Sequence, residues 1–346
     1  MSIRDRSEGI FSARDFRLAD GTVMPTVAIA YETYGRLAPD GRNAVLLTHG
    51  YTSSHRMVDL DAVQGAEGSW SDFAGPGKAI DTERLFVVAS NMLGSSYGST
   101  GPASVNPATG RPYGPDFPEI GLVDIVAAQK ALLDHLGVRH LVAVAGHSYG
   151  GFQAFQWGVS YPEFMTGLVP VISSPKGAGD QAGLDALVAR LSSDPNWNGG
   201  HYYERGGIVD TMTALRVDTL KLYGIDAQLA AEFPDKDARE SEIRRRARAW
   251  AEIYDAHSLI VLMRAAIRHD ATPELHRIKA RVLYVLSRTD RIFPPAIAPG
   301  VMAALERGGV RAEYAEIDTE RGHAYAGPDA PKWAPRLAAF MAALTG

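Results

Sequence analysis

The sequence predicts an α/β fold, in which a mostly parallel, doubly wound sheet carries an inserted helical lid. Three observations predict it: short runs rich in β-branched residues, helical patterns between those runs, and one long block where only helical patterns remain. Most of the short runs are apolar throughout rather than alternating, as expected for strands that are covered on both faces. Helices that separate such strands along the chain favour a parallel sheet.

Seven runs are predicted to be strands, because apolar and β-branched residues fill them and turn-forming residues bound them. They span residues 26–34, 44–48, 85–90, 141–145, 167–172, 281–286 and 312–317. Residues 123–136 have apolar positions at helical spacing, with Asp124 in the first turn and Gly137 where the helix is expected to end. A second helix is predicted over residues 151–160, directly after the fourth strand and a short turn.

The alternation of strands and helices stops after Ile172 and resumes at Arg281. Residues 176–268 show mostly helical patterns, and a helical block between two strands of one sheet indicates an inserted cap. We therefore expect a core domain from residues 1–174 and 275–346, with residues 175–274 as the lid. The Pro- and Gly-rich stretch 94–118 is too long for a simple connection, so it is predicted to be functional or disordered.

Composition narrows the class of protein. The chain of 346 residues carries a net charge of −5 with acids and bases mixed, which argues against a nucleic-acid or membrane-surface partner. It has no cysteine, so disulfides, thiolate metal sites and a cysteine nucleophile are excluded. Residues 1–16 lack the apolar region of a signal peptide, and no stretch approaches the ~20 apolar residues of a membrane span. The predicted location is cytoplasmic.

A nucleophile is predicted at Ser148, within the pattern Gly-x-Ser-x-Gly at residues 146–150. The pattern is common, but here a predicted strand leads into it and a predicted helix follows. That context is typical of the sharp nucleophile turn of α/β hydrolases, where glycines give the chain room and the serine hydroxyl rises above the sheet edge. The alternative is a plain strand-to-helix turn that contains a serine by chance.

A serine hydroxyl needs a base, and in this fold an acid and then a histidine follow the serine along the chain. Asp290 follows the predicted strand 281–286, and His323 follows the strand 312–317. Both lie beyond the carboxyl ends of their strands, the edge at which such sheets bind ligands. Asp318 is the second choice for the acid, because it shares one loop with His323.

Two backbone amides are expected to stabilise an oxyanion. The amide of Tyr149 directly follows the nucleophile at a helix N-terminus. The second amide is predicted to be that of Tyr51, after the His49-Gly50 pair that ends an early strand. No nucleotide-binding glycine loop and no metal-ligand spacing are present in the sequence, so neither a cofactor nor a metal is predicted.

The sequence resembles the homoserine O-acetyltransferase group of the α/β-hydrolase superfamily over nearly its whole length. The resemblance rests on residues 91–102, 106–107, 112–114, 116–118, 194–200 and 255–258, and on Asp290 just before Phe293-Pro294-Pro295. It implies a triad of Ser148, Asp290 and His323, and oxyanion donors at Tyr51 and Tyr149. It also implies a helical lid, which often forms a homodimer contact in relatives.

Three departures from that group change the expected chemistry. Its nucleophile turn typically reads Gly-Gly-Ser-Met-Gly-Gly, whereas this chain has His147 and Tyr149 beside the serine, as in ordinary esterases. Ser96 stands where the group has a cysteine. Ala324 stands where the acetyltransferases usually have an aspartate, which is thought to hold the amino group of homoserine. We expect His147, Ala324 and Tyr325 to form a pocket for a small uncharged group.

The predicted function is that of a serine esterase, which cleaves a small acyl ester through an acyl-enzyme intermediate. The small-molecule ester is the only partner that the sequence indicates beyond a homodimer. The alternative is a CoA-dependent O-acyltransferase, using an acetyl or succinyl group and an alcohol other than homoserine. A non-enzymatic ligand receptor with the same fold is the third interpretation, and the intact serine, acid and histidine argue against it.

Overall fold

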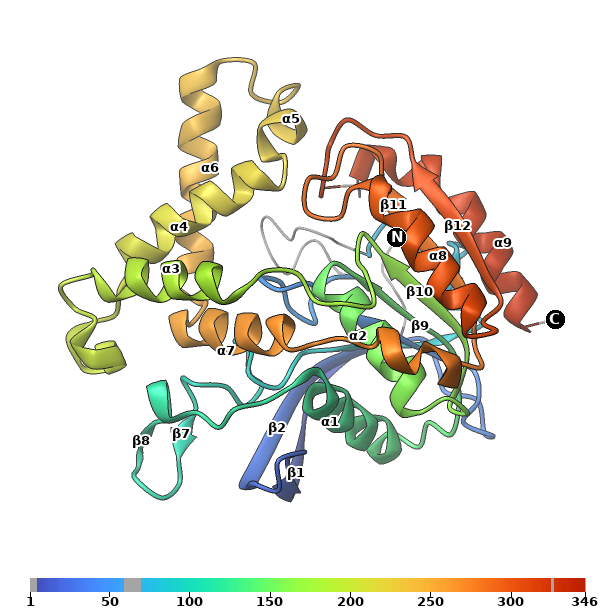
Figure 1. Cartoon of the computed structure of the whole chain (residues 1–346), viewed down its shortest axis with the longest axis horizontal. Helices are drawn as coiled ribbons and strands as arrows, with labels where there is room; N and C mark the ends of the chain where they lie inside the picture. The colour runs from blue at the N-terminus through green and yellow to red at the C-terminus, as the bar shows by residue number, and fades with distance from the viewer. Residues whose placement is uncertain (1–4, 59–69, 325–326, 346) are drawn as a thin grey trace.

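An eight-stranded sheet forms the centre of the molecule in the computed structural model, which describes residues 5–58, 70–324 and 327–345 (Figure 1). The strand order is β1-β2-β6-β3-β9-β10-β11-β12. From β6 to β12 all neighbouring strands are parallel, whereas β1 and β2 pair antiparallel with each other and β2 pairs antiparallel with β6. The predicted fold class is therefore confirmed.

The strands of this sheet are β1 (Ser7–Arg17), β2 (Val23–Tyr34), β3 (Ala44–Thr48), β6 (Phe86–Ser90), β9 (Leu141–His147), β10 (Met165–Val171), β11 (Arg281–Ser287) and β12 (Ala312–Ile317). All seven predicted strands are present, with ends shifted by up to three residues. Strand β1 was not predicted from the sequence. This strand lies at the edge of the sheet, where it pairs with β2, and most of its residues are exposed or half-buried. Its sequence therefore lacks the apolar run that predicted the other strands.

Apolar side chains cover both faces of the sheet, as the continuous apolar strands predict. Successive strand residues alternate between two cores: Leu46 packs on the face covered by α1 (Leu122–His135), α2 (Tyr149–Ser160) and α8 (Ala298–Arg307), whereas Leu47 packs on the face covered by α9 (Ala334–Thr345). This two-sided burial fixes the positions of the loops that follow the strands.

Between β10 and β11 the chain forms helices, turns and one isolated bridge but no strand, as the helical pattern predicts. The helices are α3 (Gln181–Ser192), α4 (Val209–Leu222), α5 (Ile225–Leu229), α6 (Lys236–Ala251) and α7 (Ala256–Ile267). A bridge between Lys176 and Asp270 brings the two ends of the insertion together. Apolar residues of α7 join the core beneath the lid, whereas α4 and α6 share a small core of their own. The division into two domains at 175–274 stays a prediction.

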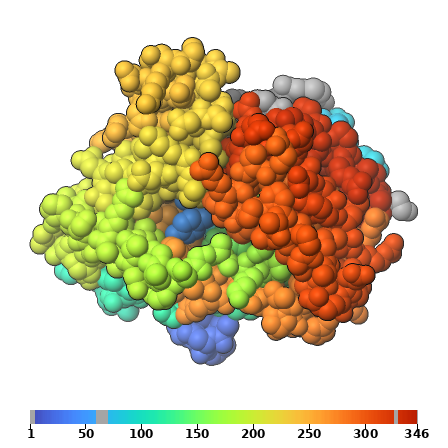
Figure 2. All heavy atoms as spheres, turned by 45° about the horizontal axis from the view of Figure 1, so that its top comes forward, coloured from blue at the N-terminus to red at the C-terminus, as the bar shows by residue number. Residues whose placement is uncertain are grey.

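The stretch 94–118 is structured rather than an open connection. It contains the short hairpin of β7 (Val105–Asn106) and β8 (Arg111–Pro112), followed by a turn of 3-10 helix at Gly114–Asp116. Tyr113 and Phe117 are buried in the main core. Figure 2 shows a hollow between the yellow-green lid and the orange-red C-terminal part, with blue atoms from early in the chain at its floor. None of the described helices is long and apolar enough to cross a membrane.

Candidate active site

Ser148 occupies a strained turn between β9 and α2. Its backbone has φ 55° and ψ −121°, a region that residues with a side chain rarely adopt. The Ser148 amide donates to the Val171 carbonyl at 2.9 Å, and its carbonyl accepts from the Ser173 hydroxyl at 2.7 Å. These contacts hold the turn in a conformation that cannot relax easily. The predicted nucleophile is thus presented at the carboxyl end of a central strand, half-buried rather than sealed in the core.

The glycines of the turn are required by close backbone contacts. A Cβ at Gly146 would clash with the Thr48 hydroxyl, and a Cβ at Gly150 would clash with the Thr48 carbonyl oxygen. Thr48 also donates from its hydroxyl to the Gly150 carbonyl at 2.8 Å. The end of β3 therefore presses directly against both sides of the serine turn.

Replacing Gly150 with alanine is expected to destabilise the fold by about 1–3 kcal/mol, because the clash is with backbone that cannot move aside. The measurement is the free energy of unfolding in denaturant. The matched control is Gly300→Ala in α8, where nothing lies within 4 Å of the new Cβ. That variant is expected to be neutral or stabilised by up to about 1 kcal/mol. Equal losses in the two variants would contradict this account of the turn.

His323 and Asp290 form a buried pair. The His323 Nδ1 lies 2.8 Å from the Asp290 Oδ2, and the aspartate side chain is fully buried. The other carboxylate oxygen accepts from the Ile292 amide at 2.8 Å and from the Phe293 amide at 3.3 Å. Burial by itself would raise the pKa of Asp290, but the histidine and the two amides outweigh it and lower that pKa. The carboxylate therefore stays ionised beside the imidazole.

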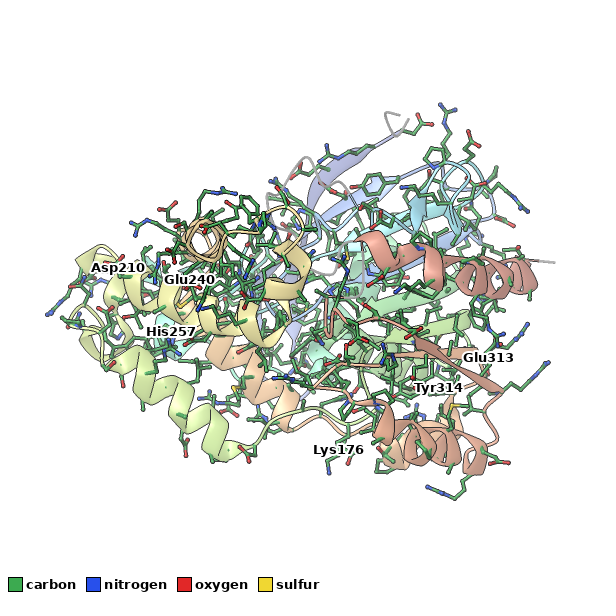
Figure 3. All side chains as sticks on the ribbon, turned by 90° about the horizontal axis from the view of Figure 1, so that it is seen from above. Lys176, Asp210, Glu240, His257, Glu313 and Tyr314 are labelled. Carbon is green, nitrogen blue, oxygen red and sulfur yellow. The ribbon has the colours of Figure 1, made fainter. Side chains whose placement is uncertain are left out.

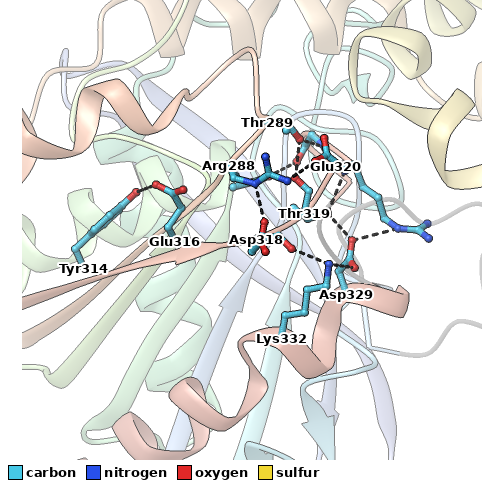
Figure 4. A network of polar contacts seen from close by, with 12 residues as sticks. Arg288, Thr289, Tyr314, Glu316, Asp318, Thr319, Glu320, Asp329 and Lys332 are labelled. Carbon is cyan, nitrogen blue, oxygen red and sulfur yellow. Dashed lines mark hydrogen bonds and ion pairs between the residues drawn. The ribbon is translucent and has the colours of Figure 1, made fainter.

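Asp318, the second choice for the acid, makes different contacts. Its carboxylate pairs with Arg288 at 2.7 Å, and 84% of its side chain is exposed. Figure 4 shows it among the charged groups that surround the loop after β12, including Lys332, which donates to the Asp318 carbonyl at 2.7 Å. The geometry brings Asp290, and not Asp318, to the His323 ring.

The loop that carries His323 is fixed by hydrogen bonds from the end of β11. The Ser287 hydroxyl donates to the Gly322 carbonyl at 2.6 Å, and the Gly322 amide donates to the Thr289 hydroxyl at 3.0 Å. Thr289 in turn donates to the Thr319 carbonyl at 2.9 Å. Acid and histidine are thus positioned by one connected pair of loops.

His49 and its neighbours hold the loop after β3. The Met92 amide donates to the Nε2 of His49 at 3.2 Å, which leaves the ring proton on Nδ1. Nδ1 then donates to the Gly50 carbonyl at 2.8 Å. Burial lowers the pKa of His49 to about 4, so the ring stays neutral. A neutral His49 fixes the direction of the Gly50–Tyr51 peptide, whose amide is the predicted second oxyanion donor.

One small pocket brings the predicted site residues together. Its lining consists of Gly50, Tyr51, Thr52, Ser53, His147, Ser148, Tyr223, His323 and Ala324. Its cavity volume is about 20 Å³, roughly the space that one water molecule needs. Tyr149 lies beside it at the first position of α2, where helix amides have no intrahelical acceptor. Tyr325, which the sequence also predicts for this pocket, lies outside the described residues.

His147 is buried at the wall of this pocket, with 4% of its surface exposed. Burial, together with the nearby His323 and His49, lowers the pKa of His147 to about 3. The ring is therefore neutral at physiological pH and brings no positive charge to the pocket.

The lid contributes one side chain to the pocket that sequence reasoning could not select. Tyr223, at the end of α4, lies with its ring 4.8 Å from that of His323. Two other lid tyrosines lie elsewhere: the rings of Tyr202 and Tyr203 pack against His257 within the lid. Figure 3 shows His257 among the lid helices, on the opposite side of the molecule from Tyr314 in β12. The sequence carries no signal that separates pocket tyrosines from packing tyrosines, because both occur at helical spacing.

In the described part of the chain, one group of side chains has metal-ligand spacing, namely Glu8, Glu32 and His55. Arginines already neutralise both carboxylates: Arg56 pairs with Glu8 at 2.6 Å, and Arg6 pairs with Glu32 at 2.7 Å. With its charges balanced in this way, the group is an ion-pair network that requires no cation.

Comparison with known proteins agrees with this fold. A family model described as the alpha/beta hydrolase fold matches residues 43–321. The homoserine O-acetyltransferase of Haemophilus influenzae is 37% identical over 333 residues, which cover 91% of this chain and 92% of that protein. This chain belongs to the homoserine O-acetyltransferase-like family of α/β hydrolases.

The solved structures that are similar to this chain include both esterases and homoserine O-acetyltransferases. Esterase E22 matches with a TM-score of 0.86 at 27% identity, and the match covers 97% of this chain and 100% of that chain. The homoserine O-acetyltransferase from Bacillus anthracis matches with a TM-score of 0.85 at 25% identity, covering 99% of this chain and 98% of that chain. Acetyltransferases and esterases therefore share this architecture, and the fold does not distinguish between them.

Proposed function

We propose that this protein is a serine esterase that hydrolyses a small, uncharged acyl ester. The Ser148 hydroxyl attacks the ester carbonyl while His323 accepts its proton, and Asp290 orients the imidazole and stabilises its cation. The amides of Tyr51 and Tyr149 stabilise the tetrahedral oxyanion. His323 then returns the proton to the leaving alcohol, and an acyl-Ser148 intermediate remains.

Water completes the reaction. His323 takes a proton from the attacking water, and the second tetrahedral intermediate collapses to release the acid and restore the Ser148 hydroxyl. Acyl transfer to an alcohol uses the same acyl-enzyme and differs only in the molecule that attacks it. The chemistry of the pocket wall, rather than the triad, therefore decides between hydrolase and transferase.

The observation that carries the esterase proposal is the uncharged lining of the pocket. Among its described lining residues there is no carboxylate, and Ala324 occupies the position directly after His323. An ammonium group bound there would lack a charge-assisted hydrogen bond, a loss of about 1.5–3 kcal/mol. An acceptor such as homoserine is thus disfavoured, whereas water needs no such partner. The similarity to homoserine O-acetyltransferases favours a short acyl group such as acetyl.

The alternative is a CoA-dependent O-acyltransferase that acts on an alcohol other than homoserine. The similarity to curated homoserine O-acetyltransferases supports this reading. A second and larger pocket, of about 520 Å³, shares Thr52 and Ser53 with the small one and is large enough for an extended donor or leaving group.

The deciding experiment follows the acetyl group from two donors, an aryl acetate and acetyl-CoA, with and without added alcohols. The esterase proposal predicts release of free acetate from the aryl acetate that depends on Ser148 and changes little when alcohols are added. Transfer from acetyl-CoA to an alcohol that is faster than acetate release would instead establish the acyltransferase. Acetyl transfer to homoserine by the unmodified protein would contradict the role given to Ala324.

Replacing Ala324 with aspartate is expected to improve the use of homoserine as an acceptor. The new carboxylate restores a partner for the ammonium group, worth about 1.5–3 kcal/mol, so kcat/KM for homoserine should rise about 10- to 100-fold. The matched control is Ala324→Asn, which has a similar shape without the charge and should give a much smaller gain. Equal gains in both variants would show that charge at this position does not select the acceptor.

A further inference from the structure

The lid contacts the loop of the proposed oxyanion donor Tyr51 through two buried side chains, Trp250 at the end of α6 and Tyr254 between α6 and α7. The Tyr254 hydroxyl donates to the Tyr51 carbonyl at 2.6 Å, and the Trp250 indole donates to the Thr52 carbonyl at 2.9 Å. The two rings stack with centroids 4.7 Å apart. Two successive carbonyl groups of a core loop are therefore held by the lid rather than by the core.

These contacts restrain the Tyr51 backbone on its carboxyl side, and His49 restrains it on the amino side. A peptide group is planar and trans, so its carbonyl and amide point in opposite directions. His49 holds the Gly50 carbonyl and thereby sets the direction of the Tyr51 amide, whereas Tyr254 holds the next peptide plane. With both planes fixed, the Tyr51 amide has little freedom to rotate.

Helix α7 also holds the side chains of both proposed donor residues. The Tyr51 hydroxyl donates to the Leu259 carbonyl at 2.5 Å, and the Tyr149 hydroxyl donates to the Leu262 carbonyl at 3.1 Å. The rings of Tyr51 and Tyr149 stack with centroids 6.1 Å apart. The part of the lid at and just before α7 is thus connected to both amides of the proposed oxyanion hole.

We propose that Tyr254 is a positioning residue for the oxyanion hole, acting through the hydrogen bond from its hydroxyl to the Tyr51 carbonyl. This inference rests on the proposed function, because it assumes that the Tyr51 amide stabilises the oxyanion. Such donors are effective only when they are already aimed at the position where charge develops. A loosened donor weakens binding of the transition state while leaving the ground-state ester bound as before.

The test is Tyr254→Phe, which removes the hydroxyl and keeps the ring against Trp250. For a short aryl acetate we expect kcat to fall about 5- to 50-fold, less than the ~10²–10³-fold typical of losing a whole donor, with KM changed by less than about 2-fold. A trifluoromethyl ketone binds as a hemiketal oxyanion on the serine, so its inhibition constant should rise by a factor similar to the fall in kcat. If Tyr254 had a purely structural role, the inhibition constant of the ketone would not change independently of KM.

The matched control is Tyr202→Phe, which removes a buried hydroxyl of the same lid that donates to the Asp255 Oδ2 at 2.7 Å. It should lower the melting temperature and leave kcat and ketone inhibition unchanged. If Tyr254→Phe does not fold, Trp250→Phe tests the neighbouring contact and should give the same split between kcat and KM. The positioning role alone would be overturned if Tyr254→Phe kept the kcat and ketone inhibition of the unmodified protein while Ser148→Ala was inactive. An active Ser148→Ala would overturn the proposed function itself.

Discussion

Replacing Ser148 with alanine is expected to lower kcat for a short acyl ester by about 10⁶-fold, the scale seen when a serine hydrolase loses its nucleophile. The reason is that no acyl-enzyme can form, and only oxyanion stabilisation by the Tyr51 and Tyr149 amides remains. Because the pocket keeps its shape, ester binding should change little. The measurement is acetate release under saturating substrate, with wild-type contamination excluded by active-site titration.

The matched control is Ser173→Ala. Ser173 donates to the Ser148 carbonyl at 2.7 Å and so supports the turn without lying on the reaction path. Losing this hydrogen bond should cost about 0.5–1.5 kcal/mol of stability and reduce activity by no more than about tenfold. If Ser148→Ala were as active as Ser173→Ala, Ser148 would not be the nucleophile.

Replacing Asp290 with asparagine is expected to have the second large effect, a loss of about 10⁴-fold in kcat. The pair at 2.8 Å keeps the His323 proton on Nδ1 and leaves Nε2 as the base. An asparagine amide can instead donate to Nδ1, which favours the wrong tautomer, and it no longer stabilises the imidazolium. KM for the ester should stay within a few-fold, because Asp290 is buried behind the histidine and does not line the pocket.

The matched control is Asp318→Asn, the acid that the sequence offers as second choice. Its side chain is exposed and pairs with Arg288, so its loss should leave both stability and kcat nearly unchanged. A loss of activity in Asp318→Asn that matches the loss in Asp290→Asn would contradict the assignment of the acid.

The sheet and the residues at its carboxyl edge could be predicted from sequence for a physical reason. A strand buried on both faces needs a continuous apolar run, and parallel strands bring their following loops to one edge. Together with the Gly-x-Ser-x-Gly pattern and the order of the residues along the chain, that rule predicted Ser148, Asp290 and His323 as one group. The structure has Ser148 and His323 in one pocket, with Asp290 behind the histidine.

The sequence predicted that the lid is helical, but it did not predict how the lid helices pack. Its helices follow one another with polar faces and small shared cores, so the apolar pattern does not say which face meets the active site. Tyr223 and Tyr254 were therefore not predicted as site residues, although both contact residues of the proposed site. The edge strand β1 escaped for a related reason, since an exposed strand has no buried face to leave a pattern.

The most direct test of the central claim is stoichiometric labelling with a fluorophosphonate, which reacts with activated serines and leaves a stable adduct. We expect one label per chain, located on Ser148 by peptide mass spectrometry, with esterase activity lost in proportion to labelling. Labelling should be absent in Ser148→Ala and slow in Asp290→Asn. An enzyme that stays unlabelled at Ser148 while it hydrolyses short esters, or that keeps its activity when fully labelled there, would contradict the account.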